Sequence, residues 1–210
     1  MATEPIIHLF KPEDNMVAYV FDNILTQGIR AGQVPARTAD ARNWFRDQAA
    51  TTTVTPSSLI SKNRGKQVGR TGVGSMYLFN YDPKHKATLP YYDRFPLVFM
   101  IEDYNDGFLG INLHYLPPRL RAQLMDALYS LSSNQRYDEN TKLRISYEIL
   151  KSAAKYRYFK PCVKRYLTSQ VKSRYLLIDP VEWDIALFLP TQRFSKKSAD
   201  FVWGESRKAV

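Results

Sequence analysis

A tight-turn sequence between two apolar segments predicts a β-hairpin near the middle of this 210-residue chain. Asn105-Asp106-Gly107 is a strong signal for a two-residue turn, because these residue types tolerate positive φ. Before the turn, Leu97–Ile101 is apolar at every position, as in a strand buried on both faces. After it, apolar and polar residues alternate over 109–115, the period of a half-buried strand. We therefore expect an antiparallel hairpin over residues 97–115.

The segments on either side of the hairpin indicate the α+β class. Apolar residues recur at helical spacing in four segments, at 13–29, 37–48, from Pro118 onward, and at about 140–156. Further strands are expected at 76–81 and 174–178, whereas 185–189 fits either a strand or a short helix. The expected fold is a small antiparallel sheet built around the hairpin, with two or three packed helices and extended terminal arms.

The distribution of apolar residues predicts three parts along the chain. In residues 1–75 they occur in short, separated groups, which indicates an N-terminal helical arm followed by a basic, glycine-rich linker. Within this part, Thr51–Ser58 is small and polar and reads as an extended connection. Residues 76–195 are expected to form the α+β core domain, and residues 196–210 a polar C-terminal tail.

The positive charge of the chain is confined to two segments. Lys and Arg number 30 against 20 Asp and Glu, a formal net charge of +10. Residues 61–75 contain four basic and no acidic residues, and residues 141–178 contain ten basic and one acidic. The remainder is slightly acidic. An imbalance this local indicates an anionic partner at particular surfaces.

The candidate contacts to such a partner lie in these two segments. They are Lys62, Arg64, Lys66, Arg70, Lys151, Lys155, Arg157, Lys160, Lys164 and Arg165. The candidate interface aromatics are Tyr91, Tyr92, Tyr156, Tyr158 and Tyr166. Cations interleaved with aromatic rings suit phosphate contact with base stacking. Tyrosine and arginine also suit a protein interface, and a solvated helix face is a third interpretation.

No catalytic residue, metal site or cofactor is expected. His8, His85 and His114 have no zinc-like spacing to one another or to Cys162. We expect His114 on the polar face of its strand and Cys162 in a structural role. The glycine-rich run 69–74 lacks the Lys-Ser/Thr of a phosphate-binding loop.

Carboxylates cluster around the predicted turns. For Asp82, Asp93, Glu102, Asp103 and Asp106 we expect mainly turn roles, because such side chains hydrogen-bond nearby backbone groups. A metal-dependent nuclease using Asp82, Asp93 or Glu102 is the enzymatic alternative. No apolar run is long enough for a transmembrane helix, and the N-terminus lacks the pattern of a signal peptide.

Three segments of the predicted core share a family pattern. Gly74–Lys84, Leu89–Val98 and Gly107–Pro117 resemble virion structural proteins of T-even-like, contractile-tailed bacteriophages and their cyanophage relatives. Ile178-Asp179-Pro180 and Trp183–Pro190 fit the same pattern, so the resemblance covers roughly residues 75–195. Proteins of this kind are tail or baseplate components or DNA end protectors. The resemblance implies no catalytic residues.

The sequence thus predicts a non-enzymatic virion protein, made in the host cytoplasm, with two alternative roles. The first is a tail or baseplate subunit that joins several neighbouring structural proteins in a symmetric assembly. In it, Gly110 would let another backbone approach, and the loop 89–92 would offer rigid aromatic contacts. The alternative is a protein that binds nucleic acid and protects the ends of packaged DNA. We expect no membrane span in either case.

Overall fold

The computed structural model describes residues 20–33, 39–132 and 157–208, and these residues form an α+β fold, as predicted. The described α-helices are α1 (Val20–Arg30), α2 (Ala39–Thr51), α3 (Pro56–Lys62), α4 (Pro118–Ser132), α6 (Trp183–Phe188) and α7 (Ala199–Lys208). The short 3-10 helices are η1 (Arg64–Lys66), η2 (Leu113–Tyr115), η4 (Arg157–Cys162), η5 (Thr168–Gln170) and η6 (Pro180–Glu182). The strands are β1 (Gln67–Val68), β2 (Met76–Leu78), β3 (Tyr92–Asp93), β4 (Leu97–Tyr104), β5 (Gly107–Asn112), β6 (Val163–Leu167), β7 (Tyr175–Ile178) and β8 (Phe194–Ser195).

The predicted hairpin is confirmed and lies inside an antiparallel sheet. β4 and β5 pair from Val98 opposite Asn112 to Tyr104 opposite Gly107, with a register shift between Met100 and Glu102. The sheet has the order β1-β7-β2-β4-β5-β6, while β3 and β8 form a separate two-stranded ribbon. The second strand of the hairpin ends at Asn112, and residues 113–115, expected to continue its alternation, form η2 instead, with all three side chains buried.

Both faces of the sheet are buried, which explains why Leu97–Ile101 is apolar throughout. Alternate residues of β2 and β4 point to two separate clusters of buried side chains. One face is largely aliphatic and faces the helices. The other centres on Phe79, whose ring lies edge-on to four neighbours at centroid distances between 5.1 and 6.2 Å, namely Tyr81, Phe108, Tyr166 and Tyr175.

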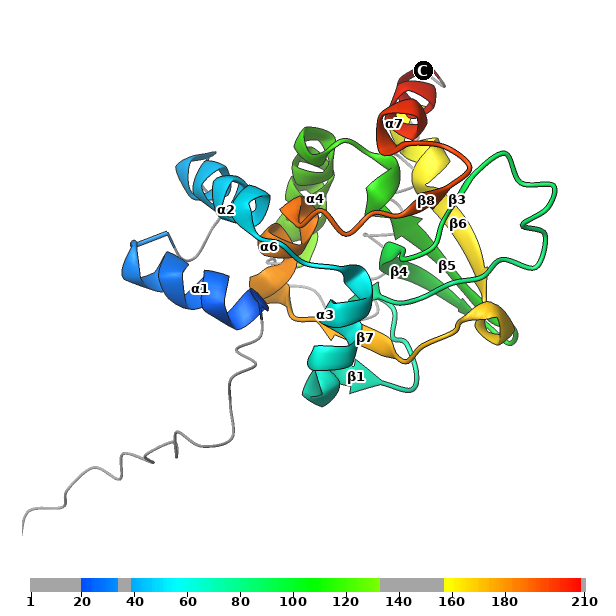
Figure 1. The fold of residues 1–210 in the computed structure, drawn as a ribbon, viewed down its shortest axis with the longest axis horizontal. Helices are drawn as coiled ribbons and strands as arrows, with labels where there is room; N and C mark the ends of the chain where they lie inside the picture. The colour runs from blue at the N-terminus through cyan, green and yellow to red at the C-terminus, as the bar shows by residue number, and fades with distance from the viewer. Residues whose placement is uncertain (1–19, 34–38, 133–156, 209–210) are drawn as a thin grey trace, which may run out of the picture.

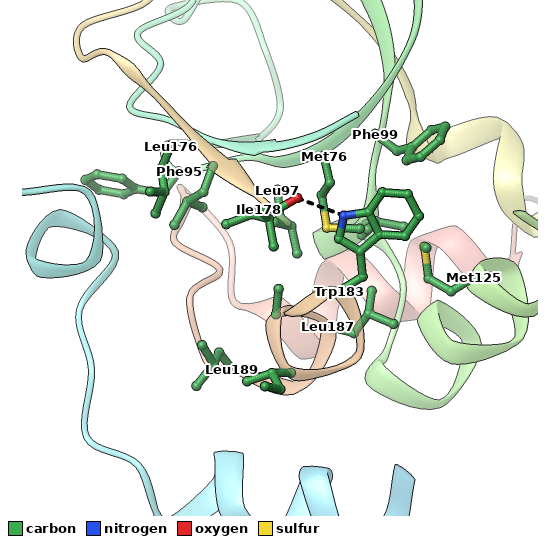
Figure 2. Close-up of a cluster of buried hydrophobic side chains, with 14 of the residues drawn as sticks. Met76, Phe95, Leu97, Phe99, Met125, Leu176, Ile178, Trp183, Leu187 and Leu189 are labelled. Atoms are coloured by element: carbon green, nitrogen blue, oxygen red, sulfur yellow. Dashed lines mark hydrogen bonds between the residues drawn. The ribbon is translucent and has the colours of Figure 1, made fainter. Parts of the chain in front are cut away.

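The helical side of the core is organised around α6, which α1, α2 and α4 each contact (Figure 1). Trp183 at the start of α6 is buried against Phe99, and its indole N–H donates to the Ile178 carbonyl at 2.9 Å. Figure 2 shows this indole beside the sheet residue Met76, with Met125 of α4 nearby. The segment 185–189, for which strand and helix were both open, is therefore mainly helical.

The described part of residues 1–75 packs against the core. Phe21 of α1, Phe45 of α2 and Leu59 of α3 belong to the same buried cluster as the sheet residues. β1 pairs with β7 and so extends the sheet. In the described residues, three short helices bring the separated apolar groups of this part of the chain together.

Two segments without expected helices, at 51–58 and 196–210, contain helical residues in the structure. The expected extended connection ends at Thr55, whose hydroxyl accepts the Ser58 N–H at 3.1 Å and caps α3, with Pro56 in the first turn. The expected polar tail contains α7, where Val202 is buried and the Trp203 indole donates to the His114 carbonyl at 2.8 Å.

The helix expected over 140–156 lies outside the described residues. In the described parts of the chain, no helix is long and apolar enough to cross a membrane.

Candidate nucleic-acid interface

The main basic segment leads to β6, the last strand at one edge of the six-stranded sheet. Lys151, Lys155 and Tyr156 lie outside the described residues, and for Arg157 and Tyr158 only the backbone in η4 is described. The remaining predicted residues of this segment are placed: Lys160 is exposed in the last turn of η4, and Lys164, Arg165 and Tyr166 follow in β6. The candidate site is built from these residues.

Lys164 is a half-buried cation without a carboxylate partner among the described residues. Its Nζ lies 4.3 Å from the centroid of the Tyr115 ring. Such a cation–π contact compensates only part of the cost of removing an ammonium group from water. Burial therefore lowers the pKa of Lys164, although the nearby Cys162 opposes this shift. An anionic ligand would supply the missing counter-charge.

Arg165 lies on the same strand but is held at the hairpin turn. Its guanidinium stacks over the Tyr104 ring at 4.0 Å and pairs with the Asp106 carboxylate. Asp106 thus combines the expected turn position with an ion pair. Because both partners are substantially exposed, this pair contributes little to stability and leaves Arg165 accessible to a phosphate.

A cavity of about 330 Å³ opens between β6 and the loop 83–92. Three predicted aromatics, Tyr91, Tyr92 and Tyr166, line it together with Lys164 and Arg165. The structure therefore unites candidates that the sequence placed in separate segments. It adds lining residues that sequence reasoning missed, namely Tyr81, Lys84, His85 and Tyr115. Two of these residues, Lys84 and His85, lie in the loop that leads to the predicted Tyr91 and Tyr92, and this closeness in the sequence could have indicated them.

A buried hydrogen-bond network lies beneath this cavity and corrects the prediction for His114. His114 is 0% exposed, not solvated on a strand face, because the chain turns into η2 after Asn112. Its Nδ1 lies 2.7 Å from Asp93 Oδ2, and its Nε2 lies 3.0 Å from the Thr191 hydroxyl. Asp93 also accepts the Phe95 N–H, which is the expected turn role.

The protonation of this network follows from its burial. Burial opposes the charge on Asp93, but His114 and donors including the Phe95 N–H together hold the pKa of that carboxyl below its usual value. Burial also lowers the pKa of His114, and Asp93 only partly opposes this. The imidazole is therefore neutral at pH 7, donating from Nδ1 to Asp93 and accepting the Thr191 O–H at Nε2.

The network is structural in spite of its catalytic appearance. Hydroxyl, imidazole and carboxylate in this order form nucleophilic triads. Thr191, however, is only 2% exposed, so its hydroxyl does not face a substrate. Cys162 is also buried, and burial raises the pKa of its thiol to about 12, as suits the expected structural role.

None of the four candidate residues in the first basic segment lines the cavity. Lys66 pairs with Asp179 at 2.9 Å and with Glu182, which joins η1 to η6 and neutralises its charge. Lys62 and Arg64 are exposed near β1, at the opposite edge of the sheet. Arg70 lines a polar hollow with Tyr104, the residue on which Arg165 stacks. Of this segment, only Arg70 therefore approaches β6.

A second basic hollow, of about 490 Å³, lies between α2 and α4 and escaped the sequence predictions. It is lined by three arginines, Arg42, Arg46 and Arg119. Arg42 Nε lies 3.6 Å from the buried Asp184 carboxylate, and Arg46 pairs with its neighbour Asp47. Two of the three cations are thus already matched to carboxylates, unlike Lys164.

A comparison with protein families bears on the two roles considered from sequence. Residues 12–207 match the family model described as phage T4 terminal DNA protecting protein. The chain belongs to this family. No curated protein and no solved structure matches the chain.

Membership in the terminal DNA protecting family confirms the resemblance to T-even-like phage proteins and extends it from residues 75–195 to 12–207. The chain is therefore a protein of the phage virion. The family supports the alternative role, DNA end protection, better than the tail or baseplate role, for which the match offers no specific support.

Proposed function

We propose that this protein binds the ends of the linear DNA packaged in the virion and shields them from exonucleases. The observation that carries the proposal is the family match over residues 12–207. The half-buried Lys164 beside a tyrosine-lined cavity supports it, because phosphate and base contacts are what a DNA end requires. Protection in this proposal comes from occupying the end, without any cleavage of DNA.

The proposal includes no catalytic step. The buried Thr191 hydroxyl and the high-pKa Cys162 thiol are poor nucleophiles, which favours binding over catalysis. Contacts to other structural subunits, in several copies of a symmetric assembly, remain our expectation for how the protein is held within the virion.

An exonuclease protection assay tests the proposal. Linear duplex DNA is incubated with the protein at about 50 mM salt, where phosphate contacts are strong, and then digested with exonucleases of either polarity. We expect intact DNA to persist with the protein and protection to fall steeply as salt rises. Covalently closed circular DNA is the matched competitor. Absence of protection, or equal competition by circular and linear DNA at equal mass, would contradict end binding.

A further inference from the structure

We propose that the cavity between β6 and the loop 83–92 receives the 5′-terminal nucleotide of the DNA, with its base among the tyrosines and its 5′-phosphate at Lys164. This inference rests on the proposed function and specifies which part of the DNA end is recognised. The cavity, of about 330 Å³, lies near the lower limit of ligand pockets, which suits one nucleotide rather than a run of them.

The walls of the cavity suit a nucleobase. Tyr92 is half-exposed at the cavity, where its ring is available for stacking. Tyr81, Tyr91, Tyr115 and Tyr166 line the remainder. Tyrosine rings stack on any base, so the pocket needs no particular terminal sequence. This tolerance fits a protein that protects ends.

The charges around the cavity suit a terminal phosphate. Lys164 is half-buried and has no carboxylate partner in the described residues, while Lys84 and Arg165 add positive charge to the rim. The one carboxylate among the lining residues, Asp93, is buried and hydrogen-bonded to His114. A phosphate monoester at a 5′ end carries up to about two negative charges at neutral pH, more than the single charge of an internal diester. Lys164 therefore favours the end over the interior of the strand.

The loop that forms one wall is already held in position. Lys196 Nζ donates to the carbonyls of Ala87 and Leu89 at 3.0 and 2.7 Å. Tyr92 pairs with Ser195 in the β3–β8 ribbon, and the buried Asp93 fastens the loop to His114. A preformed wall reduces the ordering cost of binding.

The shape of the site also explains why it would select ends. A base inside a duplex is stacked on both sides, and extracting it costs a few kcal/mol. A terminal base has only one stacking neighbour, so it enters a pocket at lower cost. A pocket for one nucleotide thus discriminates an end from the interior without reading sequence.

The test uses the full chain and a DNA hairpin with one open end that carries either a 5′-phosphate or a 5′-hydroxyl. We expect wild-type protein to bind the phosphorylated end about tenfold more tightly. Lys164→Met replaces the charged side chain by an uncharged one of similar length and should abolish this preference. Lys172 is exposed and lies outside the cavity, so Lys172→Met should retain the preference. Tyr92→Ala should weaken binding to both the phosphorylated and the unphosphorylated end by about tenfold, whereas Tyr92→Phe, which keeps the ring, should not.

A direct measurement on the wild-type protein guards against misfolded variants. Equilibrium dialysis with a labelled 2′-deoxynucleoside 5′-monophosphate should show one site per chain, with weaker binding of the nucleoside and of inorganic phosphate alone. If the protein binds DNA ends with an affinity that changes neither with the 5′-phosphate nor with the Lys164 and Tyr92 substitutions, the cavity assignment is overturned and the proposed function stays intact. Equal binding to the open hairpin and to DNA closed by loops at both ends would overturn both.

Discussion

Single residues of the same type have opposite roles in this protein. Lys66 and Lys164 both belong to the predicted basic segments. Lys66 is neutralised by Asp179 and Glu182, whereas Lys164 is packed on the Tyr115 ring without a carboxylate among the described residues. A lysine removed from water without a counter-charge is costly, and for this reason we propose Lys164 as the contact to the 5′-phosphate.

His114 provides a test at the residue scale. Its pKa is lowered by burial, opposed by Asp93 and reinforced by Arg121 and Arg193. In the unfolded state the imidazole takes up a proton near pH 6.5, whereas in the folded state it does so only at lower pH. The contribution of His114 to the free energy of unfolding is therefore fully present above pH 6.5 and is lost as the pH decreases further. We expect the urea unfolding free energy to decrease from pH 8 to pH 5, with a contribution from His114 no steeper than about 1.4 kcal/mol per pH unit.

The matched control for this prediction is the exposed His85. His114→Gln should remove most of the pH dependence between pH 8 and 5, and His85→Gln should leave it unchanged. This range stays above the ordinary pKa of aspartate, so protonation of Asp93 does not enter. Identical pH profiles for wild type and His114→Gln would show that the buried imidazole is not the titrating group.

At the scale of elements, two glycines of β5 allow its neighbouring strands, β4 and β6, to approach closely. A Cβ on Gly110 would lie 2.2 Å from Val98 Cγ1, so the close neighbour expected from sequence belongs to the same hairpin. A Cβ on Gly107 would lie 1.9 Å from the Tyr166 carbonyl oxygen in β6. The strand that carries Lys164 can therefore join the sheet only beside a glycine.

Gly107→Ala tests this pairing. The added methyl group meets backbone rather than a flexible side chain, so β6 has to shift away from β5. We expect the free energy of unfolding to fall by about 1–3 kcal/mol, the usual cost of overpacking, measured by urea denaturation. Gly65→Ala is the control, because a Cβ there meets no atom within 4 Å apart from its own residue and its chain neighbours. Equal stability of both variants would contradict the close β5–β6 contact.

At the scale of the whole molecule, the N-terminal helices and the sheet share one buried cluster. Phe45 of α2 is 1% exposed and belongs to the same cluster as Met76 and Leu97. The sheet should therefore lose stability when α2 is weakened. An independent arm would unfold without affecting the sheet.

Phe45→Ala distinguishes these cases. Truncating a buried phenylalanine costs about 3–5 kcal/mol. We expect that loss to appear in hydrogen exchange of the β4 and β5 amides, which report on the sheet itself. Ile29→Ala on α1, where the side chain is 60% exposed, should change exchange little. Unchanged protection of β4 and β5 in Phe45→Ala would mean that the helices and the sheet unfold separately.

The sequence by itself determined the features that repeat locally. The turn at 105–107, the continuous apolar run of β4 and the apolar spacing of α1, α2 and α4 all follow from backbone geometry and solvent exclusion along a short segment. The same segments also carried the resemblance to phage virion proteins. The α3 cap at Thr55-Pro56 was readable as well, but its small polar residues equally suit a loop.

Only the tertiary structure decided which charged and aromatic residues act together. The cavity combines residues near 81–92, 112–115 and 164–167, and the Asp93–His114–Thr191 network joins three further-separated positions. Ion pairing, desolvation and enclosure depend on distances between segments far apart in the chain, which local periodicity does not record. For this reason Lys66 and Lys164 are equivalent in the sequence, yet one holds the fold together and the other faces the cavity.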